Sequence, residues 1–185
     1  LLTGETPEKY QAIMLIGAPG CGKGTQGAIL GENPQFFHFS MGDAFRAMDK
    51  NTELGQELVR YSEAGELVPD ELTIRFFREE VDRLAESGEF DRTSQTLILD
   101  GIPRSVPQAS LIDYHGDGEH LFHLSCPNRE ELITRIRRRA LIEDRVDDAD
   151  EAVIRKRIKT YENETKQLLS HYDDRRTDIN ANQSR

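Results

Sequence analysis

A glycine-rich segment with one lysine gives the clearest chemical signal in this sequence. The apolar residues 12–16 run into Gly17-Ala18-Pro19-Gly20-Cys21-Gly22-Lys23-Gly24-Thr25. Glycines let the backbone turn so that successive N–H groups face one point, and the start of a helix adds its positive end there. The spacing G-x-x-x-x-G-K is that of a P-loop, whose lysine meets a terminal phosphate. The segment therefore predicts a phosphate site, with an ordinary glycine-rich turn as the alternative.

Two further polar segments carry arginines that suit a second phosphate. Arg46 follows Ser40-Met41-Gly42-Asp43, and Arg104 closes Asp100-Gly101-Ile102-Pro103-Arg104. The guanidinium fork is planar and permanently charged, so it matches the oxygens of a monophosphate. A helix-surface arginine is the alternative for Arg46, and a loop salt bridge is the alternative for Arg104.

The elements that position these segments alternate between strand and helix. Apolar runs predict strands over 12–16, 36–39, 96–100 and 120–125, with the stub of a fifth at 179–181. Apolar residues spaced three and four apart predict helices over 22–30, 43–48, 52–64, 72–88, 106–114, 127–140 and 154–172. Strands alternating with helices form parallel sheets that bind ligands at their carboxyl ends. We therefore expect an α/β fold in which the polar segments meet.

Acidic side chains are expected at two helix starts in this scheme. Asp43 is predicted to cap the helix that carries Arg46, because short polar side chains satisfy free N–H groups there. Asp147, Asp148 and Asp150 precede the last helix, which we expect to be the longest, and lie at its positive end.

Composition excludes several classes of protein. The 185 residues suit one domain, and the net charge of −10 argues against a nucleic-acid partner, which requires a basic face. No apolar stretch is long enough to span a bilayer, so no membrane partner is expected. Two cysteines without a C-x-x-C spacing fit a reducing cytoplasm. The first residue is Leu1 rather than Met, so a targeting segment could have been removed.

Several motifs in order resemble the adenylate kinase family of nucleoside monophosphate kinases. Residues 17–26 resemble its P-loop, and Leu99-Asp-Gly-Ile-Pro-Arg-Ser-Val-Pro-Gln-Ala109 resembles the segment that holds AMP. Arg145-Val-Asp-Asp148, followed by Arg155-Lys-Arg157 and Tyr161, is similar to the region after the lid of the family. The resemblance covers about 10–181.

The resemblance implies one domain over residues 1–185, with a three-layer P-loop fold and a five-stranded parallel sheet. Only five residues separate Arg139 from Arg145, which matches the short-lid form without an inserted, zinc-binding lid domain. The implied parts are a core of about 10–40, 86–134 and 148–185, a helical NMP-binding subdomain of about 41–85, and a short lid of about 135–147.

The resemblance also implies roles for single residues. The ATP site would comprise Gly20, Cys21, Gly22, Lys23, Gly24, Thr25 and Arg135. The AMP site would comprise Ser40, Met41, Arg46, Glu66, Leu67, Val68, Gly101, Arg104 and Gln108. Catalysis would fall to Lys23, Arg104, Arg139, Arg145 and Arg157, and Asp100 would hold magnesium through water. Gln108 has both a donor and an acceptor, and so could read an adenine edge.

The implied reaction is reversible, magnesium-dependent transfer of a phosphoryl group from ATP to AMP, giving two ADP. A cytoplasmic monomer is expected. Gly24 departs from the general P-loop pattern, which usually has a magnesium-binding Ser or Thr at this position. Two departures from the family pattern also bear on the site: Met41 replaces a Thr of the nucleoside pocket, and the chain ends at Arg185, where family members continue into a final helix, so the ATP adenine pocket could be incomplete. Met41 keeps a UMP or CMP kinase open as an alternative. A regulatory nucleotide switch is the other alternative, although a second phosphate site and the lack of an N-K-x-D motif argue against it.

Overall fold

The computed structural model describes residues 10–64, 66–143, 148 and 150–182. In this part of the chain five parallel strands form one sheet in the order β2-β3-β1-β4-β5. The strands are β1 (Tyr10–Ile16), β2 (Phe36–Ser40), β3 (Thr96–Asp100), β4 (Gly116–Ser125) and β5 (Arg176–Asn180). The predicted five-stranded parallel sheet is confirmed.

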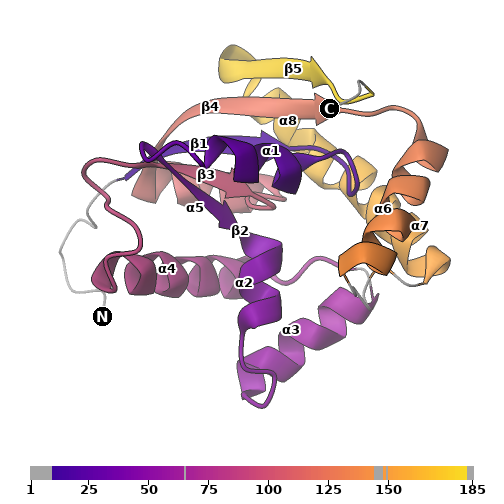
Figure 1. Cartoon of the computed structure of the whole chain (residues 1–185), viewed down its shortest axis with the longest axis horizontal. Coiled ribbons are helices and arrows are strands. Elements are labelled where there is room, and N and C mark those ends of the chain that lie inside the picture. Colours follow the sequence, from indigo (N-terminus) through magenta and orange to yellow (C-terminus); the bar gives the residue numbers. More distant parts are fainter. Residues whose placement is uncertain (1–9, 65, 144–147, 149, 183–185) are drawn as a thin grey trace.

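Helices connect the strands and cover the sheet (Figure 1). They are α1 (Lys23–Leu30), α2 (Met41–Ala47), α3 (Glu53–Ala64), α4 (Asp70–Glu86), α5 (Val106–His115), α6 (Arg129–Glu143), α7 (Glu151–Asn163) and α8 (Leu168–His171), with short 3₁₀ turns at η2 (Thr165–Gln167) and η3 (Asp173–Arg175). No helix in the described residues is both long and apolar enough to cross a membrane.

The alternating residues of β1 face two separate apolar clusters. Ala12, Met14 and Ile16 join the larger cluster, which includes buried side chains of α4, α5 and α8. Leu15 joins the smaller cluster, which includes buried side chains of α6 and α7. Successive strand residues point to opposite faces, so a strand buried on both sides must be apolar throughout. This explains the unbroken apolar run that precedes the glycines.

Helices α2 and α3 reach away from the sheet (Figure 1). They follow β2, and α3 ends below α6 and α7, which lie beyond the carboxyl ends of β4 and β5. Helix α4 instead packs on the sheet, with Phe76, Phe77 and Val81 buried in the larger cluster. Of the three helices between β2 and β3, α4 is therefore anchored on the sheet, and α2 and α3 project from it.

Two details of the predicted elements are wrong. Ser40, and not Asp43, caps α2: its Oγ accepts a hydrogen bond of 3.2 Å from the backbone N–H of Asp43. The last helix is broken after Asn163 and continues as η2 and α8, so α4 with 17 residues is longer. Asn and Thr are poor helix formers, and both occur at this break. The separate pieces still bury apolar side chains: Ile154 and Ile158 of α7 join the smaller cluster, and Leu168 and Tyr172 join the larger one.

Candidate active site

The glycine-rich turn lies between the end of β1 and the first residue of α1. Gly20 (φ 82°) and Gly22 (φ 105°) both adopt the left-handed backbone region, which glycine tolerates without strain. The turn also packs closely on α6, since a Cβ on Gly20 would lie 2.9 Å from the carbonyl oxygen of Leu132. Glycine at this position therefore permits both the turn and its packing.

Lys23 folds back over this turn. Its Nζ donates hydrogen bonds to the carbonyl oxygens of Gly17 (2.8 Å) and Ala18 (3.3 Å) and lies 3.8 Å from Sγ of Cys21. Gly22 precedes α1 without a side-chain cap, so the free N–H groups of the helix start face outward with their positive potential. An ammonium held by neutral carbonyls beside such a helix start suits a phosphate, which makes stronger charge-assisted bonds.

Asp100 ends β3 next to this turn. In the strand register it lies beside Leu15 of β1 and Ser40 of β2. A Cβ on Gly24 would be 3.5 Å from Oδ2 of Asp100, so the carboxylate faces the first turn of α1. A Ser or Thr at position 24 would be in van der Waals contact with this carboxylate, and glycine leaves that space open.

The charge of Asp100 is favoured by its neighbours. Burial alone would raise the pKa of this carboxyl, but the neighbouring His38 side chain and the charges of Lys23 and Arg104 outweigh burial and hold the pKa below its ordinary value. Within the described residues, no three or more His, Cys, Asp or Glu side chains gather to hold a metal ion. A single ionised carboxylate fits Mg²⁺, which usually takes most of its ligands from phosphates and water.

Arg104 lies among other arginines. Burial, together with the like charges of Arg157 and Arg46, lowers the pKa of Arg104 to about 10. Its Nε donates to the carbonyl oxygen of Gly101 at 2.8 Å, which orients the fork. Three cations from separate elements repel one another unless an anion lies between them. The arrangement therefore favours an anionic ligand.

Arg46 and Arg157 come from different helices and both lie near enough to Arg104 to affect its pKa. Arg46 lies over Gly42, whose added Cβ would be 3.3 Å from Nη1, and pairs with Asp43 in the same helix. Arg157 comes from α7 and pairs with Asp148. Each guanidinium is thus held by a carboxylate while the like charges stay near each other.

Asp148 joins two of the predicted catalytic arginines. It is fully buried and accepts hydrogen bonds from both Arg139 of α6 and Arg157 of α7, including one of 3.0 Å from Nε of Arg139. The sequence predicts Asp148 as a charge at a helix end, but Asp150 is the actual cap of α7. Arg145, the remaining predicted catalytic residue, lies outside the described residues.

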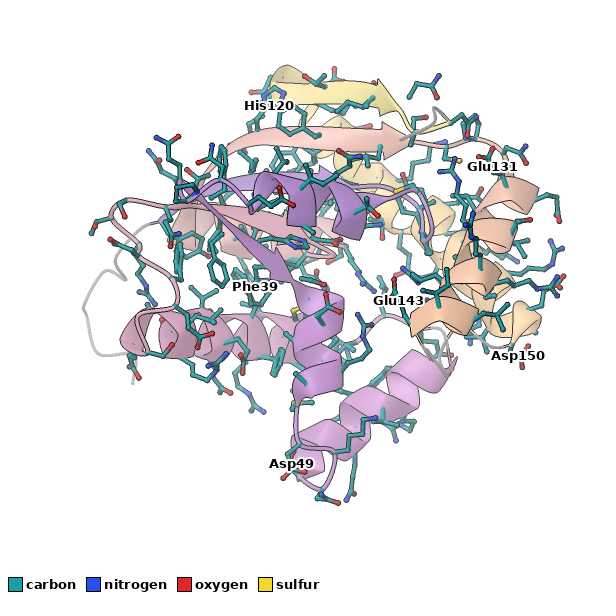
Figure 2. The ribbon with its side chains drawn as sticks, viewed as in Figure 1. Phe39, Asp49, His120, Glu131, Glu143 and Asp150 are labelled. Atoms are coloured by element: carbon teal, nitrogen blue, oxygen red, sulfur yellow. The ribbon has the colours of Figure 1, made fainter. Side chains whose placement is uncertain are left out.

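Arg135 lies on α6 one helical turn before Arg139. Its Nη1 donates to the carbonyl oxygen of Ala181 at 3.0 Å, and its Nη2 pairs with Glu131, which Figure 2 labels near the start of the helix. The side chain therefore lies between α6 and the segment that follows β5, apart from the Asp148 pair.

Comparison with known proteins identifies the family. A family profile described as "Adenylate kinase" matches residues 15–177. Adenylate kinase of Kocuria rhizophila is 38% identical over 168 residues, covering 88% of this chain and 85% of that protein. Adenylate kinase of Bifidobacterium longum is 40% identical over 169 residues (88% and 86%), and that of Mycolicibacterium smegmatis is 39% identical over 177 residues (91% and 90%). The chain belongs to the adenylate kinase family.

This result confirms the family and the phosphotransferase class predicted from the motifs. Neither the pyrimidine kinase nor the nucleotide switch is favoured, because the family profile and the relatives all carry the name adenylate kinase. The three-layer arrangement of the parallel sheet and its helices is consistent with the fold of adenylate kinases.

The residues predicted to form the AMP site of this adenylate kinase lie on three segments. Ser40 and Met41 start α2, and Met41 is almost fully buried. Glu66, in the loop that joins α3 to α4, is exposed and accepts a 2.8 Å bond from Lys156 of α7, while Leu67 and Val68 beside it are half-buried. The hydrogen bond and charge of Lys156 lower the pKa of Glu66.

Gln108 is the most enclosed of these residues. It is 1% exposed, and its Oε1 accepts a 2.8 Å bond from the backbone N–H of Arg104. Its Nε2 donates to Oδ1 of Asp70 at 2.8 Å. The amide therefore does not present an open edge in this arrangement, and a base would reach it only after neighbouring groups move. Its role as a base-reading residue stays a prediction.

Sequence reasoning missed three partners of the site. Asp148 binds Arg139, which lies 9 positions away in the chain. Asp70 binds Gln108, which lies 38 positions away. His38 of β2 has its Nε2 3.6 Å from Oδ2 of Asp100. Its position two residues before Ser40 on a strand next to β3 was a signal that could have linked His38 to the site.

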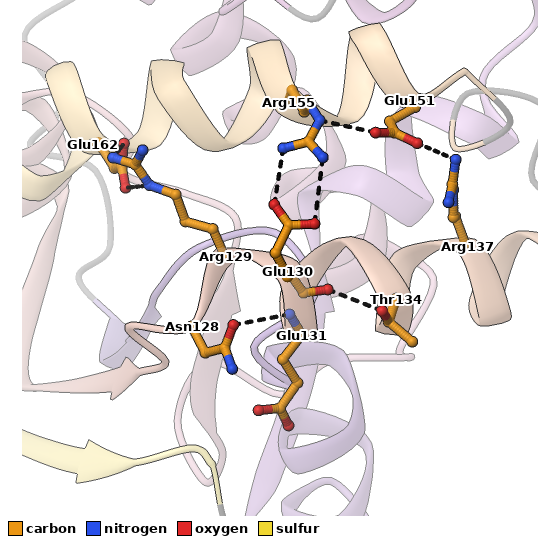
Figure 3. Close-up of polar contacts among 9 residues, drawn as sticks. All are labelled: Asn128, Arg129, Glu130, Glu131, Thr134, Arg137, Glu151, Arg155 and Glu162. Atoms are coloured by element: carbon orange, nitrogen blue, oxygen red, sulfur yellow. Dashed lines mark hydrogen bonds and ion pairs between the residues drawn. The ribbon is translucent and has the colours of Figure 1, made fainter.

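Exposed ion pairs join α6 to α7 (Figure 3). Arg129 forms a forked pair with Glu162, and Arg155 bridges Glu130 and Glu151. Glu151 also pairs with Arg137. Arg129 and Arg137 of α6 therefore each have a carboxylate partner on α7.

Proposed function

We propose that this adenylate kinase transfers the terminal phosphoryl group of ATP to AMP in a reversible reaction that gives two ADP. The observation that carries the proposal is the meeting of a P-loop lysine, the Asp100 carboxylate and Arg104 at the carboxyl ends of the adjacent strands β1 and β3. One phosphate site beside a second, arginine-lined anion site is what a donor and an acceptor nucleotide require.

The donor ATP would bind at the glycine-rich turn. Backbone N–H groups of 20–25 would meet its phosphates, and Lys23 would exchange its two carbonyl partners for a terminal phosphate oxygen. Arg135 would lie against the nucleoside part. Magnesium, when bound, would neutralise charge on the donor phosphates, and Asp100 would hold one of its waters.

The acceptor AMP would bind on the opposite side of Asp100. Arg46 and Arg104 would bind its phosphate, whose negative charge would offset the burial and the arginine repulsion that together lower the pKa of Arg104. Ser40, Met41, Gly101 and the 66–68 loop would enclose the nucleoside. Gln108 would read the base once the projecting helices α2 and α3 move.

The arginines of the lid region would serve the transferred group. Phosphoryl transfer asks a protein mainly to align two anions and stabilise spread charge, so no covalent intermediate or general base is needed. Arg139, Arg145 and Arg157 would contact the phosphoryl oxygens on closure. In this view Asp148 holds Arg139 and Arg157 in place until the phosphoryl charge arrives.

The division into parts is proposed on the same grounds. The NMP-binding subdomain would span about 41–85, with α4 as its anchored helix, the lid about 135–147, and the core the rest. Closure of both parts would exclude water, which otherwise could accept the phosphoryl group. We further propose a monomer in the cytoplasm, since Cys21 and Cys126 are both free thiols.

Steady-state turnover with ATP and each of AMP, CMP, UMP and GMP tests this function. We expect kcat/KM to be highest for AMP and activity to disappear on chelation of magnesium. Equal or better use of CMP or UMP would indicate a pyrimidine kinase. Nucleotide binding without turnover of any monophosphate would indicate a switch.

A further inference from the structure

The amide of Gln108 is held at both ends by groups with fixed hydrogen-bonding character. The backbone N–H of Arg104 can only donate, and it donates to Oε1 at 2.8 Å. The carboxylate of Asp70 accepts from Nε2 at 2.8 Å. The identity of the two ends of the amide therefore follows from the chemistry of its partners, and the reversed orientation would oppose donor to donor and acceptor to acceptor.

Asp70 is itself held in place. Its Oδ1 also accepts a 2.7 Å bond from Oγ of Ser105, and this hydroxyl in turn accepts the backbone N–H of Gln108 at 3.2 Å. Asp70 is the first residue of α4, whereas Ser105 and Gln108 belong to the start of α5. The carboxylate thus links the start of α4 to Gln108 in α5, the side chain expected to read the base.

Burial keeps this orientation from exchanging with solvent. Gln108 is 1% exposed, so water offers neither end of the amide another partner. Each end has used one of its two hydrogen-bonding positions, which leaves one N–H and one lone pair for a ligand. A base that binds there meets a donor and an acceptor in a fixed order.

That fixed order distinguishes 6-amino from 6-oxo purines. Adenine presents N1 as an acceptor and its 6-amino group as a donor, which match the free N–H and the free lone pair. Hypoxanthine and guanine present N1–H as a donor and O6 as an acceptor, so both contacts become repulsive. Their binding would require the amide to turn over against Asp70 and the N–H of Arg104, and a buried group left without its partner is costly.

We propose that Asp70 is a positioning residue that fixes the amide of Gln108 and thereby makes the acceptor site select AMP over 6-oxo purine monophosphates. The inference rests on the proposed function, in which Gln108 reads the acceptor base. Asp70 does not contact the nucleotide, and it acts through the orientation of Gln108.

The test compares AMP with inosine monophosphate as acceptors for the parent enzyme and for Asp70→Asn. The substituted side chain can present either its oxygen or its amino group to Gln108, so the reversed amide then meets only the Arg104 N–H as an unfavourable partner. We expect the ratio of kcat/KM for inosine monophosphate to that for AMP to rise by about tenfold or more in Asp70→Asn, since one of two unpaired buried groups is removed. The rise should come through KM.

Glu71→Gln is the matched control. Glu71 follows Asp70 in the first turn of α4 and is exposed, so this substitution removes the same charge from the same helix end. We expect its acceptor ratio to match that of the parent. If Asp70→Asn does not fold, Ser105→Ala loosens Asp70 from the other side and should move the ratio in the same direction by less.

Three results separate the ways in which the proposal can fail. An unchanged ratio in a folded Asp70→Asn, with both acceptors slowed equally, would overturn the positioning role and leave only a structural contact. A rise of the same size in Glu71→Gln would overturn it as well, because helix-end charge would then be the cause. Failure of the proposed function would give a different result: the parent enzyme would show no preference for AMP, and Gln108→Leu would not lower kcat/KM for AMP.

Discussion

Two networks of polar contacts in this molecule differ in what they can fix. Between α4 and α5, Asp70, Ser105, Gln108 and the Arg104 backbone form a set of partly buried hydrogen bonds between 2.7 and 3.2 Å around the buried side chain of Gln108. On the outside of α6 and α7, ion pairs of similar length join exposed side chains (Figure 3). Water and salt can replace the second kind, and only the first can hold a group in one orientation.

The comparison shows that the number and length of a residue's polar contacts do not by themselves indicate how much those contacts contribute to stability; burial also matters. Arg155 makes bonds to two carboxylates, yet its side chain is 49% exposed. Asp148 also meets two partners but is fully buried, and its loss would remove the buried carboxylate that two arginines share. Asp148 thus combines features of both networks. It forms ion pairs, as do the exposed side chains of α6 and α7 (the outer network), and it is enclosed, as is Gln108 in the hydrogen bonds with Asp70 (the inner network).

The largest effect on catalysis is expected from substitution of Lys23, the lysine of the P-loop. Lys23→Ala should abolish transfer, because the substituted side chain cannot meet the terminal phosphate charge, and should leave the fold intact because Lys23 is outside both apolar clusters. A coupled assay and circular dichroism measure the two properties. Lys50→Ala, at an exposed position, is the control. Substantial turnover in Lys23→Ala would remove this lysine from the mechanism.

Two arginines of α6 sharpen the contrast between enclosed and exposed ion pairs. Arg139 faces buried Asp148, whereas Arg137 is 57% exposed and faces Glu151. Arg139→Ala should lower kcat by about 10³-fold, far more than it raises the dissociation constant for AMP, as loss of a phosphoryl-stabilising arginine does. Arg137→Ala should stay within about threefold of the parent, against that scale. An equal loss of kcat in Arg139→Ala and Arg137→Ala would contradict the distinction between enclosed and exposed ion pairs.

Stability separates Asp148 from its neighbour Asp150. Asp148→Ala should lower the free energy of unfolding by about 3 kcal/mol, because it removes the buried carboxylate that Arg139 and Arg157 share. Asp150→Ala removes an exposed cap, whose side chain accepts from the N–H of Ala152, and should cost about 1 kcal/mol. Urea unfolding monitored by circular dichroism gives both values. A smaller loss for Asp148→Ala than for Asp150→Ala would contradict the burial argument.

The smallest effect is expected in the outer network. Glu130→Gln should change the free energy of unfolding by less than about 1 kcal/mol, and the change should shrink further at about 1 M salt. Asp70→Asn measured in the same way should keep its effect at high salt, because its partners are enclosed. Urea unfolding at low and high salt provides the test. If the effect of Asp70→Asn on the free energy of unfolding also shrank at high salt, the two networks would not differ in their shielding from solvent.

The sequence by itself determined the elements and the class of chemistry. Apolar runs that end in Gly17 or Asp100 predict the strands and the edge at which the polar segments meet, because these signals are local in the chain. The P-loop spacing predicts an anion site for the same reason: its atoms come from consecutive residues.

Only the tertiary structure decided which side chains pair. The sequence predicts Asp148 as a helix-end charge, and the fold makes it the shared partner of Arg139 and Arg157. No local pattern marks Asp70, although it holds Gln108 across 38 positions. Such pairs depend on how α4 packs beside α5 and α6 beside α7, which spacing along one helix does not specify. Burial then converts the pairs into fixed orientations, since a group removed from water keeps the partner that packing gives it.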